Sequence, residues 1–205
     1  MRFILPYFII ILVVIQLYLK KSDTSQKNKL NQFLERERKA NTTRKKDLTG
    51  LNYIKWDEAL PIKADNPLLS DILDNTPEAA TAYETVMSLR TAPMVNLTEY
   101  SNTDLKLMYG VANLELLTEY ENNYTELIKS LAVLGHSLIE HNDTADAVSY
   151  LEYSLRIGSD IRQVYSDLKD IYTSQNNTAS LNKLKQYGSL VKSVNKEAIQ
   201  SILDN

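Results

Sequence analysis

A pattern in the second half of this 205-residue chain returns after 34 positions. The aligned pairs are Leu131 with Tyr165, Leu134 with Leu168, Leu138 with Tyr172, Asn142 with Asn176, Thr144 with Thr178 and Ala147 with Leu181. The apolar members have the spacing of one helix face, and the polar members separate two such faces. A unit of this length holds a helix, a turn and a second helix, and it buries its apolar side only by stacking on its neighbours. The chain is therefore expected to adopt an all-α fold built from helical hairpin repeats, an α-solenoid.

The best repeats span residues 128–161 and 162–195. The first of them contains Leu131-x2-Leu134-Gly135-x2-Leu138 followed by Ala147-x3-Leu151. This motif resembles the tetratricopeptide repeat. Gly135 and Ala147 are expected where the two helices of the pair cross, because a bulky side chain there would push the backbones apart.

The second repeat departs from the motif at Lys169, Leu181 and Lys185, as a terminal repeat can. Residues 77–120 are suggested as an earlier repeat, and a C-terminal helix around Ile199 is expected to complete the stack. The whole chain is similar to small membrane-anchored tetratricopeptide proteins of bacteria.

That resemblance implies a concave groove, lined by the first helix of each pair, that binds a peptide or a protein. The positions that it assigns to the groove are Lys129, Ala132, His136, Ile139, Gln163, Ser166, Asp170 and Thr173. They do not supply the lysines and asparagines that clamp an acidic tail in the chaperone class of this fold. A basic or apolar partner is expected, because residues 47–205 have 12 basic and 23 acidic side chains, a net charge of −11.

The N-terminus carries a long apolar run. Seventeen residues from Phe3 to Leu19 contain no charge. This length is at the short end of a bilayer span, so residues 1–19 are predicted to form a transmembrane anchor. A cleaved signal peptide is the alternative, and it is disfavoured because no Ala-x-Ala site precedes Lys20 and Lys21.

Residues 20–46 are strongly basic, with ten bases against three acids and a net charge of +7. Such a flank places the following domain in the cytoplasm of a single-pass membrane protein. We expect six of the bases to lie on the membrane surface, namely Lys20, Lys21, Lys27, Lys29, Arg36 and Arg38. A solvated charged helix that only spaces the domain is the alternative.

Five Asn-x-Ser/Thr sequons occur in the chain, at Asn41, Asn96, Asn123, Asn142 and Asn176. In a secretory lumen they would be glycosylated, which favours the reverse topology. Two of them recur at the same place in the repeat, and turn chemistry explains that recurrence without a sugar.

Residues 47–76 read as an extended connector, because they mix Gly50, Pro61 and Pro67 with aromatic residues. Tyr53 and Trp56 are expected to pack on a helical surface. Residues 77–205 form the predicted helical domain, with helices beginning at Thr76-Pro77, near Asp104 and near Tyr124. Ser101 to Thr103 are expected to cap the helix near Asp104, and Thr144 is expected to cap a later helix.

Several kinds of chemistry lack the residues that they need. The chain has no cysteine, and His136 and His141 are five positions apart, which misses the spacing of a helical zinc pair. No metal site, cofactor or catalytic residue is therefore predicted, and the acidic body would repel nucleic acid.

The predicted function is a membrane-anchored scaffold or adaptor that binds a protein through its groove. The alternative is a structural or regulatory subunit without a free groove, filled by its own segment from Tyr53 to Leu60. If the topology is reversed, the hypothesis is an extracytoplasmic assembly factor.

Overall fold

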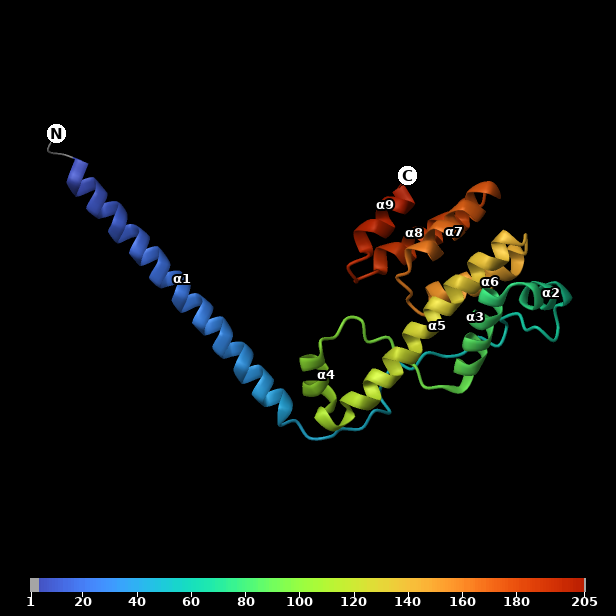
Figure 1. Ribbon diagram of the computed structural model, residues 1–205, viewed down its shortest axis with the longest axis horizontal. Helices are drawn as coiled ribbons and strands as arrows, with labels where there is room; N and C mark the ends of the chain where they lie inside the picture. The colour runs from blue at the N-terminus through green and yellow to red at the C-terminus, as the bar shows by residue number, and fades with distance from the viewer. Residues whose placement is uncertain (1–3, 205) are drawn as a thin grey trace. The chain divides into compact units, whose positions relative to one another are not determined.

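The computed structural model describes the backbone of residues 4–204 and leaves the side chains of residues 4–10, 12, 13, 17, 19 and 22–25 undescribed. Within that range the regular secondary structure is helical (Figure 1). The α-helices are α1 Ile4–Asn41, α2 Pro67–Asn75, α3 Pro77–Ser88, α4 Asn102–Tyr109, α5 Leu114–Glu140, α6 Thr144–Arg156, α7 Arg162–Ser174, α8 Thr178–Leu190 and α9 Lys196–Asp204. Two short 3-10 turns, Leu89–Thr91 and Val111–Asn113, precede α4 and α5.

The chain divides into two compact units. The first contains Met1–Asp47 and Ser101–Leu114, and the second contains Leu48–Tyr100 and Glu115–Asn205. The first unit has 12 basic and 5 acidic residues, while the second has 11 basic and 21 acidic residues. The charge division expected from the sequence therefore follows the structural division, at +7 and −10.

The predicted transmembrane anchor is wrong. Among the residues that the structure describes, no helix is long and apolar enough to cross a membrane. The uncharged part of α1 that lies in the described range, Ile4–Leu19, has sixteen residues. At about 1.5 Å per residue it spans about 24 Å, less than the hydrocarbon core of about 30 Å. The single-pass localisation, with its cytoplasmic domain, is corrected with it.

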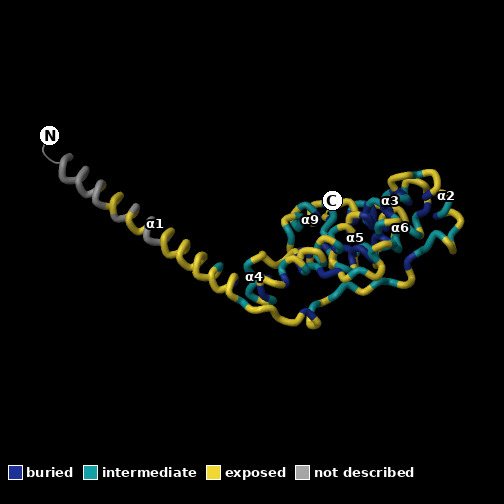
Figure 2. The backbone as a smooth tube through the Cα atoms, turned by 60° about the horizontal axis from the view of Figure 1, so that its bottom comes forward, coloured by how far each residue is buried: buried dark blue, intermediate teal, exposed yellow. Residues whose placement is uncertain are grey.

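The boundary predicted between residues 1–19 and 20–46 is also absent, because α1 continues without a break to Asn41. The six bases expected on a membrane surface are all exposed on this helix, namely Lys20, Lys21, Lys27, Lys29, Arg36 and Arg38. Figure 2 shows most of the described part of α1 in the colour of exposed residues. Arg36 pairs instead with Asp104 of α4.

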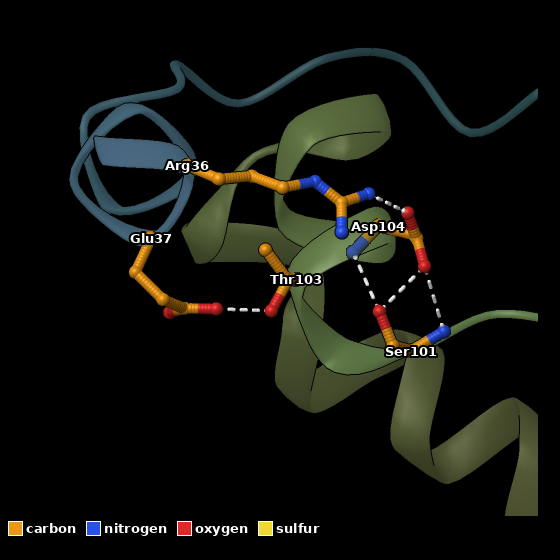
Figure 3. A network of polar contacts seen from close by, with 5 residues as sticks. All are labelled: Arg36, Glu37, Ser101, Thr103 and Asp104. Atoms are coloured by element: carbon orange, nitrogen blue, oxygen red, sulfur yellow. Dashed lines mark hydrogen bonds and ion pairs between the residues drawn. The ribbon is translucent and has the colours of Figure 1, made fainter. Parts of the chain in front are cut away.

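The last turns of α1 pack on α4 through polar side chains (Figure 3). Thr103 donates its hydroxyl to Glu37, and Lys106 Nζ lies 3.5 Å from the Glu37 carboxylate. Ser101 and Asp104 form a reciprocal capping box that starts α4, as the sequence predicted for a cap near this point. This network joins two segments that lie more than sixty residues apart in the chain.

The repeat period returns in the second unit as backbone geometry. The helices α6 and α8 each have 13 residues, and they begin 34 positions apart at Thr144 and Thr178. Asn142 and Asn176, also 34 apart, adopt left-handed backbone angles of φ 64° and 53°. Asparagine tolerates this conformation, so turn chemistry accounts for the recurrence of these two residues.

The close helix crossing expected at Gly135 is present. A Cβ atom added to Gly135 of α5 would lie 2.5 Å from Leu151 of α6. Ala147 of α6 is fully buried in the cluster that joins α5 and α6. Both small residues therefore lie in the packed interior of the hairpin.

Two apolar clusters form the core of this unit. One joins the connector, α2, α3, α5 and α6 around Leu69, Val86, Tyr124, Leu134 and Tyr150. The other joins α5 and α6 to α7, α8 and α9 around Leu151, Tyr165, Leu168, Leu184 and Ile199. The helices α7, α8 and α9 lie side by side, so α9 covers the apolar end of the stack (Figure 1).

The structure differs from the predicted element boundaries at four places. The predicted connector 47–76 contains α2, which Asn66 caps by accepting from the amides of Leu68 and Leu69. The helix expected from Tyr124 begins ten residues earlier, at Leu114.

The other two differences concern caps. Thr76 does not cap α3 with its side chain, since its hydroxyl contacts His141 Nε2 at 3.3 Å. At the start of α6 the capping side chain is Asp143 rather than Thr144. No side chain caps α3, whereas Asp143 caps α6 by accepting from the Asp146 amide.

Candidate functional site

The predicted groove residues lie on two helices that are in contact. Those on α5 are Lys129, Ala132, His136 and Ile139, and those on α7 are Gln163, Ser166, Asp170 and Thr173. Contact between the helices is direct here, because His136 Nδ1 lies 3.0 Å from Asp167 Oδ2. We call the surface formed by His136, Ile139, Glu140, Gln163, Ser166, Asp167 and Asp170 the α5/α7 face.

Asp167 lies at the centre of this face. Its side chain is 8% exposed, and it accepts a hydrogen bond of 2.7 Å from Gln163 Nε2. His136 contacts its other carboxylate oxygen, and His136 Nε2 lies 3.8 Å from Glu140. In the described part of the chain, Asp167 has no lysine or arginine within ion-pairing distance. A nearly buried carboxylate held by one amide and one imidazole is a strong acceptor for an added cationic group.

The face is acidic at its edges as well. Glu140 and Asp170 are exposed beside the Asp167 cluster on α5 and α7. Lys129 lies about two turns from His136 along α5, and it pairs with Glu126 at 3.1 Å. The combination favours a basic segment over an acidic one.

Besides Lys129, two predicted groove residues lie outside the α5/α7 face. Ala132 is buried in the cluster between α5, α6 and α7, where it contributes apolar packing. Thr173 lines a separate hollow of about 290 Å³ between α7, α8 and α9, together with Lys169 and Lys185. Ile139 is partly buried against both apolar clusters, and it forms the apolar part of the face.

A larger hollow of about 460 Å³ lies between α6, α7 and α8. Tyr172 donates to Glu152 Oε1 there at 2.7 Å, and Val148 and Gln175 line the same space. Burial, with a smaller contribution from Glu152, raises the pKa of Tyr172. The Tyr172 hydroxyl and the Glu152 carboxylate in this hollow are therefore already paired with each other.

The connector occupies a second candidate surface. Three tyrosines contact its backbone: Tyr153 donates to Lys55 O at 3.2 Å, Tyr150 donates to Pro61 O, and Tyr83 accepts from Lys63 N at 2.8 Å. We call Tyr83, Tyr150 and Tyr153 the tyrosine cradle. Trp56 packs edge-on against Tyr153 with ring centres 6.1 Å apart, as expected for an aromatic residue of the connector.

Sequence reasoning missed Asp167 and the tyrosine cradle. Asp167 follows Gln163 by one helical turn, so it belongs to the α7 row that was expected to line the groove. Its role depends on His136, which lies 31 positions earlier and is brought beside it only by folding. The cradle tyrosines have helical spacing that is also typical of core residues, and the hydroxyl contacts are not visible in a sequence.

No group of three or more metal-ligating side chains occurs among the described residues. His136 and Asp167 form a pair of the kind found in catalytic sites, but no hydroxyl nucleophile contacts His136 in the described structure. The absence of enzymatic activity stays a prediction.

Comparison of the chain with protein-family models, with curated proteins and with solved structures found no match. The resemblance to tetratricopeptide proteins therefore remains a prediction from the sequence motif.

Proposed function

We propose that the helical unit is a protein-interaction module that binds a basic segment of a partner protein on the α5/α7 face. The observation that carries this proposal is Asp167, a carboxylate that is 8% exposed and has only an amide and a histidine as side-chain partners. An arginine or lysine from a partner would donate a charge-assisted hydrogen bond to the Asp167 carboxylate.

The setting of Asp167 supports the same proposal. Glu140 and Asp170 add negative charge around it, and the unit as a whole has a net charge of −10. A surface of one sign attracts a segment of the opposite sign and rejects acidic competitors. Ile139 supplies an apolar contact beside the charge, which suits a segment in which basic and apolar residues alternate.

A second candidate function is a structural or regulatory subunit without a free groove. The observation that favours it is the connector, which already lies against Tyr150 and Tyr153 of α6. The two functions concern different surfaces, because the connector contacts α3 and α6 and the Asp167 cluster lies on α5 and α7.

The proposal is tested by selection of a displayed library of random 12-residue peptides on the full chain. The expected result is enrichment of peptides that carry arginine or lysine, and loss of that enrichment on the Asp167→Asn variant. Asp71→Asn is the matched control, since Asp71 is exposed on α2. Enrichment of acidic peptides on the full chain would contradict the proposal. Equal enrichment of basic peptides on Asp167→Asn and Asp71→Asn would also contradict it.

A further inference from the structure

The connector is held in the manner of a bound peptide. The tyrosine cradle bonds to its main chain at Lys55 O, Pro61 O and Lys63 N, and the Trp56 ring packs against Tyr153. Ile54 adds a further main-chain bond, donating to Met94 O at 2.9 Å, and Tyr53 forms an isolated antiparallel bridge with Val95. Main-chain contacts of this kind fix an extended segment without depending on most of its side chains.

The side chains of the segment add few buried contacts. Between Lys55 and Lys63, Leu60 is buried at 6% exposure, and Trp56, Asp57, Pro61 and Ile62 are partly buried. A surface segment held by one buried and a few partly buried side chains opens locally at a lower free energy than the core.

Two exposed ion pairs give the surface a charge preference. Arg156 pairs with Asp57, and Arg90 pairs with Glu58. Both arginines belong to a unit whose net charge is −10. Arg156 also stacks over the Tyr153 ring, with its guanidinium carbon 5.7 Å from the ring centre. The surface around the cradle therefore selects acidic side chains, the opposite of the α5/α7 face.

We infer that the tyrosine cradle is a second docking surface, which the chain masks with its own segment 55–63. Its partner is an extended segment of another protein with the chemistry of the occupant: an aromatic residue, two carboxylates, and then leucine and proline. Docking of that segment displaces the connector, so the two occupants exclude each other. The inference stands apart from the α5/α7 face, because it uses different helices and the opposite charge.

The first test measures binding of a labelled peptide that copies residues 52–63, NYIKWDEALPIK. In the full chain with Trp56→Ser and Leu60→Ser, the chain's own segment loses its two apolar anchors. We expect the peptide to bind this variant at least tenfold more tightly than it binds the parent, since a tethered occupant competes at about millimolar effective concentration. A peptide that carries the same two serines should not bind.

Charge variants identify the surface. We call the chain with Trp56→Ser and Leu60→Ser the released variant. Arg156→Glu, added to the released variant, is expected to weaken peptide binding at least fivefold. Arg162→Glu is the matched control, because Arg162 is exposed at the start of α7, and it should leave binding unchanged. Equal effects of the two substitutions would overturn the inference. So would a parent chain that sediments as a dimer with exchanged connectors, since the occupant would then be a second copy.

The second test needs no substitution. Hydrogen exchange in the parent chain compares the Ile54 and Lys63 amides with the Leu134 amide of α5. The inference predicts that the two connector amides exchange at least a hundredfold faster and by local opening that is independent of mild denaturant. Exchange of all three amides only through global unfolding would overturn the inference. In the peptide-binding test, loss of helical structure in the released variant would also overturn it.

Discussion

Gly135 is the residue at which the packing of the hairpin has the least space. An added Cβ would lie 2.5 Å from both Cγ and Cδ2 of Leu151, so the leucine would have to move within a fully buried position. Gly135→Ala is therefore expected to lower the free energy of unfolding by about 1–3 kcal/mol. Denaturant unfolding followed by circular dichroism measures this loss.

Gly50→Ala is the control for this substitution, because a Cβ at Gly50 meets no atom within 4 Å. It should change stability by less than about 0.5 kcal/mol. The double variant Gly135→Ala with Leu151→Ala tests the contact itself. If the double variant lost as much free energy of unfolding as the two single variants together, the clash with Leu151 would be contradicted.

The buried tyrosines make stability depend on alkaline pH. Burial raises the pKa of Tyr153 to about 12 and raises the pKa values of Tyr124, Tyr150 and Tyr165 further. Because these folded-state pKa values exceed the ordinary value of 10.0, the unfolded chain ionises first, and stability is lost as pH rises above 10. Tyrosinate absorbance and helical circular dichroism should therefore change together. Ionisation of every tyrosine while the helices remain intact would contradict this.

At the scale of the helices, the two repeat turns are capped by different residues. Asp143 caps α6 and Asn177 caps α8, each accepting from the amide three positions later. Asp143 is 6% exposed, and its Oδ2 has no hydrogen-bond partner. A buried unpartnered acceptor costs about 1–3 kcal/mol, more when it is charged, whereas a carboxylate gains only about 0.3–1 kcal/mol from the helix dipole.

Asp143→Asn is therefore expected to stabilise the chain by about 1 kcal/mol, since it keeps a capping oxygen and removes a buried charge near Asp146. The same change should lower the raised pKa of Asp146, to which Asp143 contributes after burial. Asn177→Asp is the matched control in the other repeat, and it should be neutral within about 0.5 kcal/mol. Thermal unfolding of both variants checks this, and a destabilised Asp143→Asn would contradict it.

The contact between α1 and α4 is expected to respond to acid. The Thr103 hydroxyl lowers the pKa of Glu37 below its ordinary value of 4.5, and the Ser101 hydroxyl lowers that of Asp104 below 3.8. A depressed carboxyl pKa stabilises the contact above the ordinary value, and that contribution is lost as pH falls through the folded-state pKa.

Amide exchange of Leu105 in α4 should therefore quicken between about pH 5 and about pH 3 beyond the intrinsic pH dependence of exchange. The variant with Glu37→Gln and Asp104→Asn lacks both carboxylates. Its Leu105 amide exchange should therefore follow only the intrinsic pH dependence of exchange. If parent and variant showed the same pH response, the Glu37–Thr103 and Asp104–Ser101 contacts would not hold α4.

The helices that could be predicted from the sequence are those with strong local signals. Proline at Pro77, the serine cap at Ser101 and the 34-residue period each marked an element that the structure contains. The helix α2 was missed because its nine residues lie in a stretch read as proline-rich connector. The anchor was wrong because the uncharged part of α1 in the described range, Ile4–Leu19, is too short to cross the hydrocarbon core.

At the scale of the whole molecule, charge separates the units and the surfaces. The basic unit contains α1 and α4, and the acidic unit contains the repeats. Within the acidic unit, the α5/α7 face exposes carboxylates around Asp167, while Arg90 and Arg156 flank the tyrosine cradle. The sequence period predicted the row that contains His136 and Gln163. It could not predict Asp167 as the centre, because that role arises from contacts across two helices.

Calorimetric titration with one library-selected basic peptide measures whether Asp167 organises a face for basic segments. The parent and Asp71→Asn are expected to bind the peptide equally. Asp167→Asn is expected to bind it at least tenfold more weakly, a difference of about 1.4 kcal/mol. Equal affinity for all three folded proteins would show that Asp167 does not organise this face.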